Sequence, residues 1–247
     1  MKKWFGFGAV FIVCYLIFLI ATAPASLVLN QVKLPKDVMV QGLSGSIWHA
    51  KAQKVYVQNT VIENVNTELD VISLLSFSPS VDVTFGDAML PGPEGAMVVS
   101  FVSGNLHVND ANVLLPANMI AQQLPLPIPM AAQGVVELDI PSYEQGKPLC
   151  QSLTGTVNWQ RAKINAMEQS IALGQIGGDL RCDKGAIALE IKPDNTLGLS
   201  YNAFIGANFK VSGNGYLTPG NEFPEQLKGV LPFIGSPDRQ GRYRLRL

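Results

Sequence analysis

The chain has 247 residues and a formal net charge of −1, with 15% charged residues against 47% hydrophobic ones. Proteins that bind nucleic acid need clustered Lys and Arg to neutralise phosphates, so this balance argues against a nucleic-acid partner. The length allows one large or two small domains, and 23 glycines and 16 prolines favour a turn-rich β protein over a helical one.

The first predicted element is an apolar helix over residues 4–23, which follows Lys2 and Lys3. A run of about 20 uncharged residues has the length needed to cross a bilayer. A cleaved signal peptide is the competing interpretation, because Ala21-Thr22-Ala23 resembles a cleavage site. The length of the run and Pro24 directly after it favour an uncleaved anchor. The two lysines then place residues 1–3 in the cytoplasm and the rest of the chain across the membrane.

A short motif, Gly42-Leu-Ser-Gly45-Ser-Ile-Trp48, follows the apolar run, and a looser copy occurs later as Leu153-Thr-Gly155-Thr-Val-Asn-Trp159. In both copies Gly permits a bend or a close approach, a β-branched residue favours a strand, and Trp supplies an apolar anchor. We expect each motif to open a strand, with Trp48 and Trp159 as core residues. The alternative is an ordinary strand start that is repeated by chance.

From Val38 onward, apolar and polar residues alternate with period two, which predicts antiparallel strands with one polar face. In the first half, strands are expected over 54–58, 64–71, 81–85, 96–102 and 106–115. Pro116 then begins a short helix that reaches Leu124.

The segment Leu124-Pro-Leu-Pro-Ile-Pro129 excludes both helix and interior strand. We interpret residues 125–129 as an extended connector between β halves at 24–124 and 130–247; a long ordered loop within one sheet is the alternative.

The second half repeats the plan of the first. Strands are expected over 134–143, 153–166, 170–173, 178–182, 186–192, 196–203 and 207–217, then a short helix over 223–231. In the last strand Tyr243 and Leu245 alternate with arginines. The predicted fold is therefore mainly β: an N-terminal transmembrane helix, then a long curved antiparallel sheet in two duplicated halves with short helices.

The cysteines fit an exported chain. Cys14 lies within the apolar run, which leaves Cys150 and Cys182 as the only pair outside it. In an oxidising compartment such a pair suits a single disulfide, which would close a loop of about 30 residues and contribute roughly 3 kcal/mol. A metal site is the weaker alternative, because zinc takes four ligands and only His49 and His107 could join the pair.

No residue pattern favours catalysis. Ser44 lies between glycines but lacks the spacing of a Gly-x-Ser-x-Gly elbow, and His49 and His107 fall on separate predicted strands. The glycines from Gly174 to Gly178 precede strand-like residues rather than a helix, so they do not form a phosphate cradle. We expect a protein that is not an enzyme, without catalytic residues, cofactor or metal.

Taken together in their order, these motifs resemble the protein N family of the bacterial type II secretion system. The resemblance rests on the apolar start, the Gly42–Trp48 motif, Cys150 close to Leu153-Thr-Gly155, Cys182, and the ending Gly235-Ser-Pro-Asp-Arg-Gln-Gly241-Arg-Tyr243. One departure is Ala50, where a Gly is expected. The resemblance covers essentially the whole chain. It implies an accessory protein of the inner membrane that faces the periplasm and assists the export of folded proteins.

Two functions of different classes follow. The first is a scaffold that binds other secretion components, with the inner-membrane clamp protein or the outer-membrane secretin as candidate partners. The second is an AsmA-like β groove, in which the apolar face of the sheet binds or shuttles a lipid.

Overall fold

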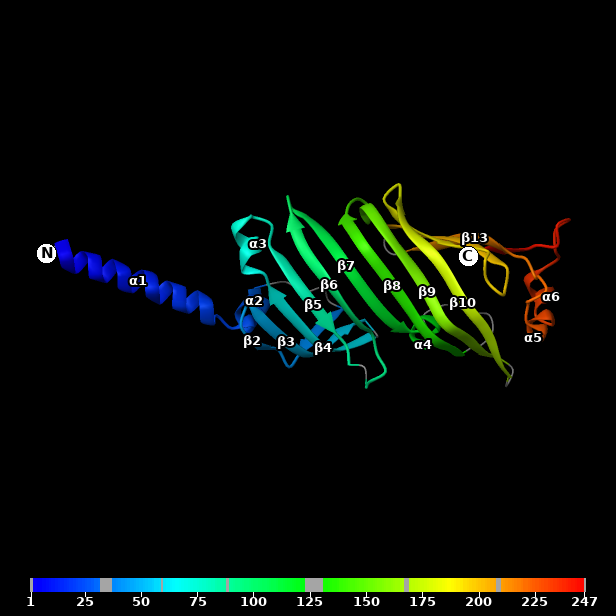
Figure 1. Ribbon diagram of the computed structural model, residues 1–247, viewed down its shortest axis with the longest axis horizontal. Coiled ribbons are helices and arrows are strands. Elements are labelled where there is room, and N and C mark those ends of the chain that lie inside the picture. The colour runs from blue at the N-terminus through cyan, green and yellow to red at the C-terminus, as the bar shows by residue number, and fades with distance from the viewer. Residues whose placement is uncertain are drawn as a thin grey trace.

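The computed structural model describes residues 2–31, 37–58, 60–87, 89–122, 131–166, 169–207 and 210–246. The chain starts with two helices, α1 (Lys2–Thr22) and α2 (Ala25–Gln31), and α1 projects from one end of a long sheet (Figure 1). A helix is therefore present where a transmembrane helix was expected over 4–23, and its crossing of a membrane stays a prediction. Its side chains are described from Val10 onward, and the large apolar ones as far as Ile20 are exposed. Within the described residues, no helix is both long enough and apolar enough to cross a membrane.

Residues 37–122 form the first seven strands of the sheet and two short helices. These elements are β1 (Val38–Gln41), β2 (Ser44–Gly45), β3 (His49–Val57), β4 (Thr60–Leu69), α3 (Val71–Leu75), β5 (Ser80–Phe85), β6 (Glu94–Val102), β7 (Asn105–Pro116) and α4 (Ala117–Ala121). The strands expected over 81–85, 96–102 and 106–115 match β5, β6 and β7. The prediction was wrong at the end of β4, because α3 begins at Val71 where the strand was expected to continue.

The elements after residue 130 begin with the three longest strands, β8 (Ala131–Gln145), β9 (Cys150–Ala166) and β10 (Gln169–Asp183). They continue with β11 (Ala186–Ile191), β12 (Leu199–Ile205), β13 (Val211–Leu217), α5 (Glu225–Lys228), α6 (Leu231–Ile234) and β14 (Tyr243–Arg246). The two strands expected over 170–173 and 178–182 form a single strand, β10. Its pairing with β9 shifts register on both sides of Gly174. The helix expected over 223–231 is divided into α5 and α6, because Pro232 in the first turn of α6 cannot continue α5.

The described strands form one 14-stranded antiparallel sheet whose order follows the chain from β1 to β14, with β2 paired to β3 beside this path. Short turns between strands produce this meander, because an antiparallel pair needs only a tight connection. The mainly β, antiparallel prediction is thus confirmed. The division into two halves at 24–124 and 130–247 stays a prediction, and the expected connector over 125–129 lies outside the described residues.

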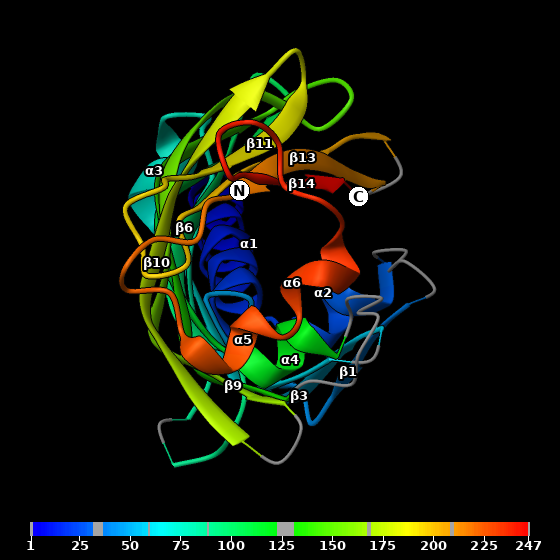
Figure 2. The same cartoon turned by 90° about the vertical axis from the view of Figure 1, so that its right-hand side faces the viewer.

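The sheet is a curved single layer. Viewed along its long axis it forms an open arc, and α4, α5 and α6 lie on the inner side (Figure 2). Register shifts between Ala96 and Val98 and on both sides of Gly174 mark β-bulges, which bend strands and increase their twist. The accessible surface is 16632 Å², whereas a compact monomer of this mass exposes about 10,700 Å². Much of the sheet therefore has no second layer packed on it.

The best-packed region lies at the C-terminal end of the sheet. One cluster of buried side chains comes from β9 and β10: Ala162, Ile171, Leu173 and Ile176. A second consists of Leu217, Phe223 and Leu231. Leu227 of α5 packs against both clusters, so the short helices cover this end of the apolar face.

Candidate functional site

The Gly42–Trp48 motif forms a tight hairpin. Gly42 and Gly45 have φ values of +67° and +91°, in the left-handed region that favours glycine. Gly45 pairs with Ala50, and the Ser46 N–H donates to the His49 carbonyl at 3.1 Å. A Cβ on Gly45 would lie 2.2 Å from the His49 oxygen, so only glycine fits at this position.

This hairpin holds the end of α1 against the sheet. The Trp48 indole N–H donates to the Ile20 carbonyl at 3.1 Å, and the Ile47 N–H donates to the Ala23 carbonyl at 2.9 Å. An isolated bridge between Pro24 and Ser46 extends the contact. Trp48 was expected to be a core residue; it is half-buried, and it spans the junction between α1 and the sheet edge.

The second copy of the motif occupies a different setting. Gly155 lies inside β9, opposite Leu180, and a Cβ there would lie 2.8 Å from the Asp139 carbonyl oxygen. Trp159 packs against the β9–β10 cluster, and its indole N–H donates to the Gln133 carbonyl at 3.0 Å. Strands β4 to β8 separate the two motifs in the sheet order, so the structure does not bring Trp48 and Trp159 together.

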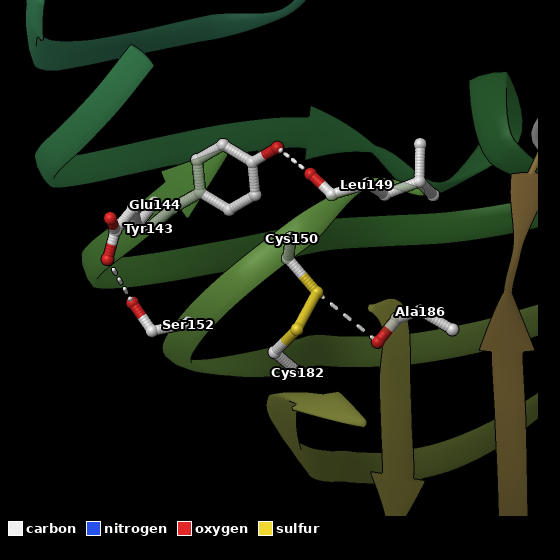
Figure 3. The surroundings of a disulfide bond; sticks show 7 residues. All are labelled: Tyr143, Glu144, Leu149, Cys150, Ser152, Cys182 and Ala186. Carbon is white, nitrogen blue, oxygen red and sulfur yellow. Dashed lines mark hydrogen bonds between the residues drawn. A yellow bond between two sulfur atoms is a disulfide. The ribbon is translucent and has the colours of Figure 1, made fainter. Parts of the chain in front are cut away.

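The predicted disulfide is present between Cys150 and Cys182, with a Cα–Cα distance of 6.0 Å (Figure 3). It joins the start of β9 to the end of β10. Nearby, the Tyr143 hydroxyl donates to the Leu149 carbonyl at 2.7 Å, and burial raises the pKa of Tyr143 above its ordinary value. The turns that follow β8 and β10 also meet, since the Leu149 N–H donates to the Gly185 carbonyl at 3.0 Å.

The strand register aligns apolar residues across ten strands. Directly opposed residues in an antiparallel pair lie on the same face, and the opposed pairs connect into one apolar row from β5 to β14. Its members are half-buried or buried: Phe85, Gly95, Val113, Leu138, Val157, Gly178, Ile191, Tyr201, Gly215 and Leu245.

On each of these ten strands, a residue next in sequence to the member of the apolar row belongs to a polar row on the opposite face of the sheet. With the exception of Ala96, the members of the polar row are polar or charged, and most are exposed: Thr84, Ala96, Asn112, Asp139, Thr156, Asp179, Glu190, Asn202, Asn214 and Arg246. The apolar row belongs to the concave side, because α5 packs on that face and lies within the arc (Figure 2). The sheet therefore has an apolar inner face and a polar outer face.

The two ends of the sheet order are edge strands. At one end, β14 follows a turn in which Asp238 accepts hydrogen bonds from the Arg242 backbone and guanidinium, which lowers the pKa of that carboxyl below its ordinary value. The Arg242 guanidinium also lies over the Tyr216 ring, 4.4 Å from its centroid. Among the described strands, β14 has a single neighbour, β13, and β1 pairs only with β3.

The candidate ligands from the sequence are dispersed. His49 is exposed at the start of β3, while His107 lies on β7, 4.0 Å from Glu144. Among the described residues, no group of three or more His, Cys, Asp or Glu side chains is arranged to hold a metal ion. Sequence reasoning missed α3, although Asp70 carried a signal: Asp is a favoured N-cap, and its side chain accepts from the Ile72 N–H.

Comparison with known proteins gives a consistent result. The family model for protein N of the type II secretion system matches residues 36–246. The type II secretion system protein N of Aeromonas hydrophila is 32% identical over 250 residues, which cover 100% of this chain and 98% of that protein. The proteins of that name from Vibrio cholerae and Pectobacterium carotovorum are 28% and 25% identical, covering 98% of this chain and 97% and 95% of theirs. No solved structure matches the chain.

Proposed function

The chain belongs to the type II secretion system protein N family, and from this premise we propose that it is an accessory component of that machine. In this proposal it is anchored in the bacterial inner membrane, faces the periplasm and assists the export of folded proteins across the outer membrane. The observation that carries the proposal is the family match over residues 36–246, together with relatives that are similar over the full length.

The proposed anchor is α1. Its described apolar side chains are exposed on every side of the helix, and a helix that is apolar all round suits a lipid environment better than water. The length of the anchor comes from the sequence, because the uncharged run extends from Trp4 to Ala23 whereas side chains of α1 are described only from Val10 onward. With Lys2 and Lys3 on the cytoplasmic side, residues 24–247 would lie in the periplasm as two β halves joined by residues 125–129.

The proposed mode of action is protein–protein contact through the open edges of the sheet. Edge strands carry backbone donors and acceptors that a partner strand can pair with. The inner-membrane clamp protein and the secretin are the candidate partners. The exposed Arg246, on edge strand β14, and the exposed Asn112, in the middle of the polar face, allow a matched comparison.

The test is photocrosslinking in secreting cells, with a photoreactive residue at Arg246 or at Asn112. We expect adducts with the clamp protein or the secretin from position 246 and none from position 112. Adducts that are no more frequent from position 246 than from position 112, or that form from neither position, would exclude the β14 edge as the contact.

A second candidate function is lipid binding on the concave face. It is favoured by the apolar row, whose side chains from Phe85 to Val157 are half-buried although they face the inner side of the sheet. Native mass spectrometry of the full chain, purified from its membrane, measures this directly. A bound lipid of defined mass would support the groove. Protein free of lipid would exclude it and leave the scaffold function in place.

A further inference from the structure

The short helix α3 (Val71–Leu75) buries its polar residue and exposes its large apolar ones. Its polar residue Ser73 is buried, with 8% of its surface exposed, whereas Ile72 and Leu75 are 76% and 80% exposed and Phe77, just after the helix, is 91% exposed. Single exposed apolar residues are common on protein surfaces, but a cluster of them around a buried polar side chain reverses the usual pattern. We call Ile72, Leu75 and Phe77 the α3 patch.

Hydrogen bonds fix this orientation. The Asp70 carboxylate accepts from the Ile72 N–H at 2.9 Å and caps the helix. The buried Ser73 hydroxyl donates to the Asp70 carbonyl at 2.5 Å and accepts from the Ser80 N–H at 2.9 Å. Ser73 is therefore satisfied in the interior, and the α3 patch is held outward by the fold.

The α3 patch lies at the end of the sheet from which α1 projects (Figure 1). A chain of hydrogen bonds connects the two helices: Trp48 donates to Ile20 of α1, and the Leu69 N–H, directly before the α3 cap, donates to the Trp48 carbonyl at 2.9 Å. Close to α3, the Phe101 N–H near the end of β6 donates to the Pro79 carbonyl at 3.0 Å, and Phe101 is itself 50% exposed.

We propose that the α3 patch is a second membrane contact, which inserts into the surface of the bilayer leaflet where α1 emerges. This inference rests on the proposed α1 anchor, because α1 brings the bilayer to this end of the sheet. The segment from Val71 to Phe77 has no charged side chain, so apolar insertion into the interfacial region needs no anionic lipid. One helix alone leaves the sheet free to swivel about the anchor; two contacts fix its orientation against the membrane.

The test is the depth of a fluorescent dye in full-length protein reconstituted into phosphatidylcholine vesicles. The exposed native Cys14 near the middle of α1 carries the dye in the first sample. Two further samples carry it at Phe77→Cys or at Phe233→Cys in a Cys14→Ser background. Phe233 is the matched control, because it is 83% exposed but belongs to α6 at the far end of the molecule (Figure 1).

Spin-labelled lipids with the quencher near the headgroup or deep in the acyl region then report depth. We expect the deep quencher to act more strongly on Cys14, the shallow quencher to act more strongly on position 77, and neither to act on position 233. If neither quencher acts on the dye at position 77, as expected at position 233, the membrane contact is overturned. Quenching at Cys14 would still support the anchor in that case, and the α3 patch would be free for a protein partner. An unquenched Cys14 would instead contradict the proposed anchor.

Discussion

Gly45 illustrates how a single residue determines the junction between α1 and the sheet. A side chain at this position would meet two penalties. The backbone φ is +91°, and a Cβ would lie 2.2 Å from the His49 carbonyl oxygen. Gly104 provides a matched control, because its φ is +85° but, among the described residues beyond its two chain neighbours, no atom lies within 4 Å of the position that a Cβ would take.

We expect Gly45→Ala to lower the free energy of unfolding by about 3 kcal/mol or more, and Gly104→Ala by only about 1–2 kcal/mol. Thermal unfolding of the full chain in detergent, followed by circular dichroism, measures both. Equal losses for the two variants would contradict the close approach at Gly45.

Two tyrosines provide the second prediction. The Tyr201 hydroxyl is buried without a hydrogen-bond partner among the described residues, whereas the Tyr143 hydroxyl donates to the Leu149 carbonyl. Removing an unsatisfied hydroxyl is neutral or favourable, and removing a satisfied one costs about 1 kcal/mol. Tyr201→Phe should therefore keep or raise the melting temperature, and Tyr143→Phe should lower it. The reverse order in the same unfolding assay would show that Tyr201 has a partner.

The two tryptophans show what could be predicted at the residue scale. The sequence was sufficient to identify both motifs and to place Trp159 on a strand, because β-branched neighbours and period two are local signals. It could not show that Trp48 reaches Ile20, since that hydrogen bond joins residues 28 positions apart and depends on how α1 meets the hairpin.

At the scale of elements, the disulfide constrains the β9–β10 hairpin. The bridge closes a loop with a sequence separation of 32 residues, which corresponds to about 3–4 kcal/mol in the chain-entropy model. The double variant Cys150→Ser, Cys182→Ser should lower the melting temperature by several degrees, with Cys14→Ser as the matched control that leaves it unchanged. An unchanged melting temperature in the double variant would mean that the unfolded chain gains little freedom without the bridge.

Most strands were predictable because each has one polar face, and burial alternates with period two in β5 and β14. The failures have physical causes. Helix α3 was not predicted, because the apolar–polar alternation of β4 continues into Val71. Strand β10 was predicted as two strands because its glycines suggest turns, whereas a bulge accommodates Gly174 within one strand.

At the scale of the whole molecule, the open arc could not be derived from the sequence alone. Periodicity predicts which residues share a face, as in the apolar and polar rows, but the bulges that curve the sheet depend on register between strands. The same limit applies to the packing of helices on the sheet. The sequence predicted short helices, but it did not show that α5 packs on the inner face at one end of the sheet. An apolar concave face and a projecting apolar helix are the features that the proposed function has to explain.

The most direct test of the central claim is the secretion of a folded type II substrate by a strain that lacks this protein. We expect the extracellular fraction of the substrate to fall and to be restored by the full chain. A version in which residues 2–23 are replaced by a cleavable signal peptide should reach the periplasm without restoring secretion, because the proposed anchor is missing. Secretion that is unchanged by the deletion would contradict the proposed role in export.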